Sequence, residues 1–181
     1  MELFLLRHGK PDIDSSTAVR SVDMSSWIAE YDEAGVSGAP DAAIAAVCNN
    51  QFIVCSPVRR ALESVSILGI EADVIIDELH EVPLPVFNIP LLELRPSLWA
   101  ALFRLFWTLG GSRGVETFSS AKMRAKFVSC ELDKMAEVHG RVLSVGHGFM
   151  NTLIAIELKK AGWKKLKSDS SGYWSCIKLV R

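Results

Sequence analysis

Short runs of apolar residues alternate along the chain with longer segments in which apolar residues recur at helical spacing. The short runs predict buried strands at residues 2–6, 51–55, 74–76, 141–145 and 173–180. The longer segments predict helices at residues 41–50, 56–68, 98–109, 119–138 and 148–161. Buried strands that alternate with helices indicate a three-layer α/β/α fold with a mostly parallel central sheet.

Several predicted helix ends carry residues that commonly start or stop helices. Asp41 follows Pro40 and is a candidate N-cap, and Ser56 is another, with Pro57 at the first helical position. Gly140 and Gly162 follow the last residues of two other helices.

We expect one domain over residues 1–181, with a cap-like insertion at about 79–115 over one end of the sheet. The proline-rich segment 82–96 predicts an ordered loop, neither strand nor helix. The next helix, 98–109, is apolar nearly all round, and its role stays open. It could pack on the domain, cover the site as an apolar lid with Trp107, contact a membrane surface or form a homodimer.

Composition and charge exclude several classes of protein. The chain has 181 residues, 20 Lys+Arg against 21 Asp+Glu and a net charge of −1, which argues against a general nucleic-acid binder. The N-terminal apolar run stops at Arg7, so we expect no secretion signal. No apolar stretch reaches the roughly 20 residues that span a bilayer, so we expect no stable membrane insertion.

The four cysteines, Cys48, Cys55, Cys130 and Cys176, form no CxxC pair and have no zinc-like spacing. Three of them lie in apolar stretches, which predicts buried thiols. This usage suits a reducing compartment, and we expect a cytoplasmic protein.

Charged and imidazole side chains follow four of the predicted strands. In chain order they are Arg7 and His8 with Gly9, then Arg59 and Arg60, then His80 and Glu81, and finally His147. Because the carboxyl ends of parallel strands meet at one edge of a sheet, we expect these residues to converge there.

This set of residues suits phosphoryl transfer. Arginine guanidinium groups match phosphate oxygens, and the helices after Ser56 and His147 direct their N-termini to the same place, which favours an anion. A histidine can attack phosphorus, and a carboxylic acid can protonate the leaving alkoxide and then activate water. The glycines beside His147 indicate close backbone approach to a ligand. The strand ends carry no cluster of carboxylates for Mg²⁺, so we expect neither a metal nor a cofactor.

Three motifs resemble those of the histidine phosphatase superfamily. Residues 6–9 (LRHG) resemble its RHG signature, residues 56–61 (SPVRRA) its S-P-x-x-R-A motif, and residues 145–148 (VGHG) its last motif. The resemblance covers almost the whole chain and implies a phosphoglycerate mutase-like fold. Ser64 falls where a Thr or Ser usually follows the second motif.

The resemblance also implies roles for individual residues. His8 would carry the phosphoryl group as a phosphohistidine, and His147 would assist catalysis. The phosphate-binding set would be Arg7, Gly9, Arg60 and His147. Arg59 could exchange roles with Arg60 if the alignment slips by one residue.

The general acid is implied to lie in the loop after the third strand. Glu81 is preferred because it lies close to the strand end, Glu93 is the alternative, and Glu78 ranks third. Glu116 could lie at the rim of the pocket, but a charge at a helix N-terminus is the favoured interpretation. The lysines between 159 and 167 are expected to be solvated at the opposite edge of the sheet.

We therefore expect a metal-independent phosphatase that hydrolyses a small phosphomonoester. The loop after Glu81 lacks the Gly-x-Trp-Glu-Gly run common in mutase-like members, and the chain is short, which favours a phosphatase over a mutase. The alternatives are a phosphoglycerate-type mutase, a phosphatase of phosphorylated protein such as phosphohistidine, and a non-catalytic phosphate-binding scaffold.

Overall fold

A computed structural model describes residues 1–40, 51–168 and 172–181, and its centre is a six-stranded sheet of order β6-β5-β8-β1-β10-β9. Four neighbouring strands are parallel: β6 (Val74–Ile75), β5 (Phe52–Cys55), β8 (Arg141–Gly146) and β1 (Glu2–Arg7). The strand β10 (Cys176–Val180) pairs antiparallel with β1 and with β9 (Lys164–Ser168). The mostly parallel sheet expected from the sequence is confirmed.

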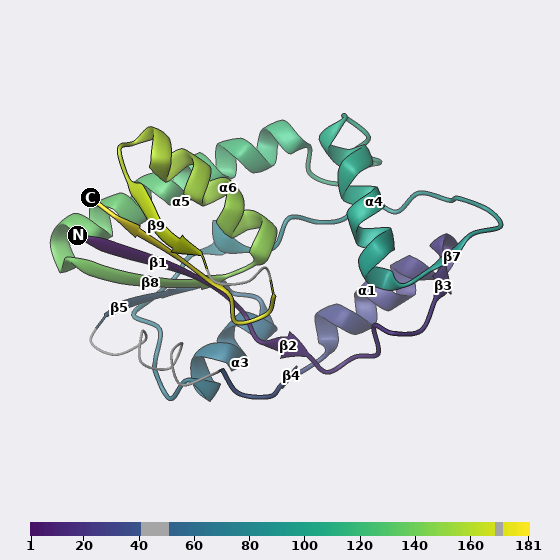
Figure 1. The fold of residues 1–181 in the computed structure, drawn as a ribbon, viewed down its shortest axis with the longest axis horizontal. Coiled ribbons are helices and arrows are strands. Elements are labelled where there is room, and N and C mark those ends of the chain that lie inside the picture. The colour runs from purple at the N-terminus through teal and green to yellow at the C-terminus, as the bar shows by residue number, and fades with distance from the viewer. Residues whose placement is uncertain (41–50, 169–171) are drawn as a thin grey trace.

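Helices cover both faces of this sheet (Figure 1). Leu3 and Leu5 of β1 pack on one face with α5 (Phe118–His139) and α6 (Gly148–Lys160). Phe4 and Leu6 alternate with them and pack on the other face, against α3 (Arg59–Ile67). The three-layer α/β/α arrangement is therefore confirmed.

Two further helices, α1 (Met24–Glu33) and α4 (Pro96–Thr108), lie together beyond the end of the sheet where β1 leads into β2 (Figure 1). Met24 of α1 and Trp99 and Phe103 of α4 form a small core of their own. Trp107 is also fully buried. The aromatic side chains of α4 thus serve packing within the molecule, while Leu98 and Leu105 are exposed on its outer face.

Some predicted boundaries were wrong. The helix expected from Ser56 begins at Arg59, because the Ser56 N–H continues the sheet by donating to Val145 O. Segment 82–96 contains a short strand, β7 (Glu93–Leu94), because its backbone pairs with β3 (Val19–Arg20). The last strand begins only at Cys176, since Trp174 has a φ of +59°, which interrupts extended backbone.

Other elements were not predicted, namely α1, the strand β9 and the short pair β2 (Lys10–Pro11) and β4 (Val36–Ser37). The helix expected at 41–50 lies outside the described residues, as does Cys48. Cys55 and Cys176 are buried, as expected for two of the three thiols, whereas Cys130 is exposed on α5. Within the described ranges no helix is long and apolar enough to cross a membrane.

Two lysines of β9 lie where the sequence placed them. Lys164 and Lys165 are exposed and pair with Val180 and Leu179, at the end of the sheet where β1 begins. They are therefore far from the strand ends that carry the candidate site.

Candidate active site

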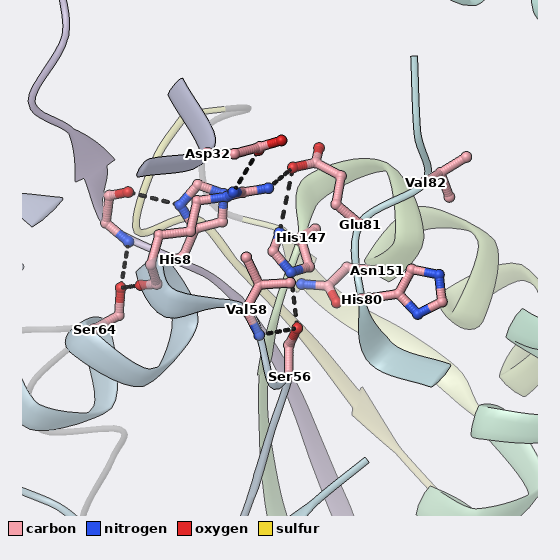
Figure 2. A network of polar contacts seen from close by, with 12 residues as sticks. His8, Asp32, Ser56, Val58, Ser64, His80, Glu81, Val82, His147 and Asn151 are labelled. Carbon is pink, nitrogen blue, oxygen red and sulfur yellow. Dashed lines mark hydrogen bonds and ion pairs between the residues drawn. The ribbon is translucent and has the colours of Figure 1, made fainter. Parts of the chain in front are cut away.

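The carboxyl ends of the parallel strands bring together four of the predicted site residues. His8 follows β1, Glu81 follows the 3-10 helix Asp77–Leu79, and His147 follows β8 (Figure 2). The fourth is Arg60 on α3, which is hydrogen-bonded to His8 and Glu81. His8, Arg60 and His147 are at most 1% exposed. The Glu81 side chain is 32% exposed. The convergence expected from the order of the strands therefore occurs.

His8 is held in one tautomer. Its Nδ1 lies 2.7 Å from the Gly9 carbonyl oxygen, which can only accept, so Nδ1 carries the proton. The Nε2 atom is left as an acceptor and receives a hydrogen bond from Arg60 Nε at 3.3 Å. Burial, with a smaller contribution from His147, lowers the pKa of His8 to about 3. Nε2 therefore presents a lone pair at neutral pH.

Arg60 connects the polar groups of the site. Besides His8, it donates to Asp32 Oδ1 at 2.9 Å and to Glu81 Oε2. Its neighbour Arg59 points away and pairs with Glu63 at 2.6 Å. The geometry thus places Arg60 and not Arg59 in the site.

Glu81 and His147 form a second pair. Glu81 Oε2 lies 3.4 Å from His147 Nδ1, and His147 Nε2 lies 2.9 Å from Ser56 Oγ. Burial raises the pKa of Glu81, but the contacts with His147 and Arg60 outweigh it and hold that pKa well below its usual range. Burial lowers the pKa of His147, and Glu81 offsets part of that effect. Glu81 is therefore ionised while it holds these partners.

Arg7 lies at the same edge of the sheet and lines the adjacent cavity. Its guanidinium lies 4.2 Å from the centroid of the Tyr173 ring, and its buried Nε has no hydrogen-bond partner among the described residues.

The two glycines beside His147 lie close to other side chains. A Cβ on Gly148 would lie 3.1 Å from Arg7 Cδ, and one on Gly146 would lie 3.1 Å from Asn151 Oδ1. The glycines beside His147 therefore make room for these side chains, and close approach of their backbone to a ligand stays a prediction.

Gly9 is required by packing. Its N–H donates to Ser64 Oγ at 2.8 Å, and a Cβ there would collide with Val36 and Trp174. Ser64 Oγ also donates to Arg60 O at 2.6 Å, so it ties the RHG segment to α3. A part for Gly9 in phosphate binding stays a prediction.

Two helical arginines hold the backbone on either side of Glu81. On α5, Arg124 donates to Glu78 O at 2.6 Å and to His80 O at 2.7 Å. On α4, Arg104 donates to Val82 O at 2.9 Å. Sequence reasoning missed both arginines, because nothing in their helices indicates a bond to a distant backbone.

Glu116 is the counterion of Arg124, with contacts of 2.6 and 3.0 Å. It lies just before Thr117, the N-cap of α5, and so at the start of the helix. Through Arg124 it also helps to hold the backbone beside Glu81. Glu93, the alternative acid, is exposed on β7 and does not line the cavity. Glu78 contributes its backbone carbonyl.

A cavity of about 680 Å³ opens beside these residues. Arg7, Arg60 and Glu81 line it together with residues of α1 and α4 that sequence reasoning did not assign to the site. Those from α4 are Pro96, Ser97, Ala100 and Arg104. Trp107 is not among the residues that line the cavity, so its side chain does not form a lid over it.

His8, Glu81 and His147 could each offer one ligand atom to a metal ion, since those atoms lie within 4.8 Å of one another. However, the Arg60 guanidinium is hydrogen-bonded to two of these three residues. A fixed positive charge in that position opposes a bound cation and favours an anion.

No family model matches the chain, and no curated protein matches its sequence. Solved structures do match its fold. The phosphoserine phosphatase of Entamoeba histolytica, in complex with 3-phosphoglyceric acid, is 14% identical with a TM-score of 0.54, over 99% of this chain and 90% of that chain. A protein described as mycobacterial hydrolase 1 is 20% identical with a TM-score of 0.58, over 88% and 78%. The alpha-ribazole phosphatase of Shigella flexneri is 17% identical with a TM-score of 0.51, over 98% and 94%.

At these identities the comparisons establish the fold. The chain has the phosphoglycerate mutase-like α/β/α fold that its resemblance to the histidine phosphatase superfamily implies.

Proposed function

We propose that the chain is a metal-independent phosphatase that hydrolyses a small phosphomonoester through a phosphohistidine on His8. The observation that carries this proposal is the tautomer of His8, whose unprotonated Nε2 lies beside the Arg60 guanidinium. Two of the proteins that share the fold are phosphatases by name, which supports the same class of reaction.

In the first step His8 Nε2 attacks phosphorus, a P–N bond forms and the P–O ester bond breaks. Arg7, Arg60 and His147 donate hydrogen bonds to the non-bridging oxygens, and the two arginines offset their charge. The leaving alkoxide takes a proton from Glu81 and departs as the alcohol.

In the second step the ionised Glu81 takes a proton from a water molecule, whose oxygen attacks phosphorus. The P–N bond breaks, its electron pair returns to His8 Nε2, and inorganic phosphate leaves. Glu81 must therefore be protonated when substrate is bound, although it is ionised when paired with Arg60 and His147. Phosphoryl oxygens that take over these two donors would leave Glu81 unpaired in a buried site, which raises its pKa.

The test is hydrolysis of 4-nitrophenyl phosphate in excess EDTA by the wild type, by His8→Ala and by His139→Asn. His139 stacks on Phe52, away from the site, and serves as the matched control. We expect hydrolysis by the wild type and the control, and an acid-labile phosphohistidine after rapid quenching, with both lost in His8→Ala. Equal rates in the wild type and His8→Ala would reject His8 as the nucleophile.

A further inference from the structure

The cavity beside Glu81 is larger than a phosphoryl group requires. Its volume of about 680 Å³ lies within the range of pockets that bury most of a drug-sized ligand. The alcohol portion of a substrate therefore has room of its own, and the lining of that room determines which alcohol binds.

Aromatic side chains of α1 form part of this lining. Trp27 and Tyr31 lie one helical turn apart, with ring centroids 5.2 Å apart and planes inclined by 28°. The Trp27 indole is fixed in place because its Nε1–H donates to Asp14 O at 2.9 Å. The helix that carries them shares a buried core with α4, which contributes Ala100 to the same cavity. Trp27 and Tyr31 therefore give this wall flat ring surface, and the Arg60 guanidinium lies 5.0 Å from the centroid of the Tyr31 ring.

The other lining side chains without a full charge are mostly aliphatic, among them Ile28, Val82, Leu84 and Ala100, while Ser15, Ser97 and Tyr173 are the hydroxyl-bearing ones. Such a surface gains most from an apolar ligand group, and aromatic rings add favourable stacking geometry.

Most charged groups of the lining already have polar partners, but the buried Nε of Arg7 has none among the described residues. The cavity's arginines are Arg7, Arg60 and Arg104, its carboxylates are Asp32 and Glu81, and no lysine lines it in the described part of the chain. Arg104 donates to backbone carbonyls of the acid loop. Once a phosphoryl dianion occupies Arg7 and Arg60, a second anionic group would find in the lining only Arg104, whose N–H groups already bond backbone carbonyls, and the imidazole of His80. Its loss of hydration would be poorly compensated in a partly buried site.

We propose that the cavity selects phosphomonoesters whose alcohol carries a flat, uncharged aromatic ring, which packs against Trp27 and Tyr31. Small phosphoesters with a carboxylate on the alcohol portion are disfavoured. This inference rests on the proposed phosphatase function for its reaction, but binding tests it independently.

Binding is measured by calorimetry with three unreactive phosphonates: 2-phenylethylphosphonate, propylphosphonate and 3-phosphonopropionate. We expect the aromatic compound to bind at least about tenfold more tightly than the propyl compound, and the carboxylate to bind most weakly. Hydrolysis of 2-phenylethyl phosphate and propyl phosphate is compared in parallel, because their alcohols are similar leaving groups.

Two adjacent alanines of α4 provide a matched pair of variants. Ala100 lines the cavity, whereas Ala101 is exposed and does not. Ala100→Leu should weaken binding of 2-phenylethylphosphonate about tenfold and leave propylphosphonate within about twofold, while Ala101→Leu should change neither.

Equal affinity of the wild type for the aromatic and propyl phosphonates would overturn the inference, even if both esters are hydrolysed. A preference for the aromatic phosphonate without hydrolysis of either ester would support the ligand class and overturn the proposed phosphatase function.

Discussion

The guanidinium of Arg60 and the carboxylate of Glu81 form an ion pair in the place where a bound phosphoryl group would need the same guanidinium. Arg60 is 1% exposed and also holds Asp32, so it has little freedom to serve both anions. Phosphoryl oxygens and Glu81 therefore compete for one set of donors. If the phosphoryl oxygens displace the Glu81 carboxylate from Arg60, Glu81 loses its main partner and becomes easier to protonate. Substrate binding is then coupled to formation of the general acid.

This competition predicts opposite effects on binding and turnover for Glu81→Gln. Turnover should fall at least about 100-fold, because a glutamine cannot transfer the proton. Inorganic phosphate should bind as tightly as to the wild type or more tightly, because a neutral amide competes less well for Arg60. Steady-state kinetics and calorimetry with phosphate measure the two effects.

Glu93→Gln is the control for that experiment, since Glu93 is exposed on β7. It should keep the wild-type rate. A normal rate in Glu81→Gln together with a large loss in Glu93→Gln would transfer the acid role to Glu93.

Adjacent arginines on α3 should differ sharply in their contribution to activity. Arg60→Lys should lower kcat/KM by about 100-fold, because one ammonium group cannot reproduce a planar guanidinium at a multiply bonded site. Arg59→Lys should stay within about twofold, because Arg59 belongs to an exposed ion pair with Glu63. Circular dichroism checks that both variants fold, and a larger loss in Arg59→Lys would show that the two positions exchange roles.

The imidazole of His8 should stay neutral across the ordinary pH range, since burial lowers its pKa to about 3. Between that pKa and the usual value of about 6.5, the unfolded state binds more protons at His8 than the folded state does. The unfolding free energy should therefore fall as pH drops below about 6.5. Nitrogen-15 NMR, assigned with His8→Ala, should show the Nδ1–H tautomer down to pH 5, and titration near 6.5 would contradict the assignment.

Much of the site could be predicted because its residues follow buried strands. A strand such as β1 is a plain apolar run, and the parallel order of the sheet then fixes where Arg7 and His8 emerge. The same reasoning placed Glu81 and His147 beside them.

The residues that shape the cavity could not be predicted in this way. The segment Met24–Glu33 does carry a helical pattern, with Met24, Trp27, Ile28 and Tyr31 at i, i+3, i+4 and i+7, which the prediction overlooked. What the pattern does not give is the packing partner of this helix, α4, about 70 residues further along the chain. The place of Trp27, Tyr31 and Asp32 at the cavity therefore could not be predicted before the fold was known. The strand β9 was missed for a related reason: its sequence KKLKS has one apolar residue, and pairing with β10 forms the strand.

The backbone that carries Glu81 is also held by contacts between residues far apart in the sequence. Arg124 reaches the carbonyl oxygens of Glu78 and His80, which are 46 and 44 residues away in the sequence. Its bidentate partner Glu116 fixes the guanidinium plane. The backbone just before the acid is thus held from α5, and Arg124 itself does not line the cavity.

Arg124 should therefore act as a positioning residue, with an effect on turnover and not on substrate binding. Arg124→Met should lower kcat about tenfold with KM within about twofold, because a loosened loop misplaces the acid while Arg60 still binds the phosphoryl group. Arg124→Lys should restore only part of the rate, since one ammonium cannot hold two carbonyls and a bidentate carboxylate together.

Lys126→Met, at an exposed position on the same helix, is the matched control and should match the wild type. In a Glu81→Gln background, Arg124→Met should have little further effect on kcat. A full tenfold additional loss there would mean that Arg124 stabilises the fold in general and does not act through Glu81.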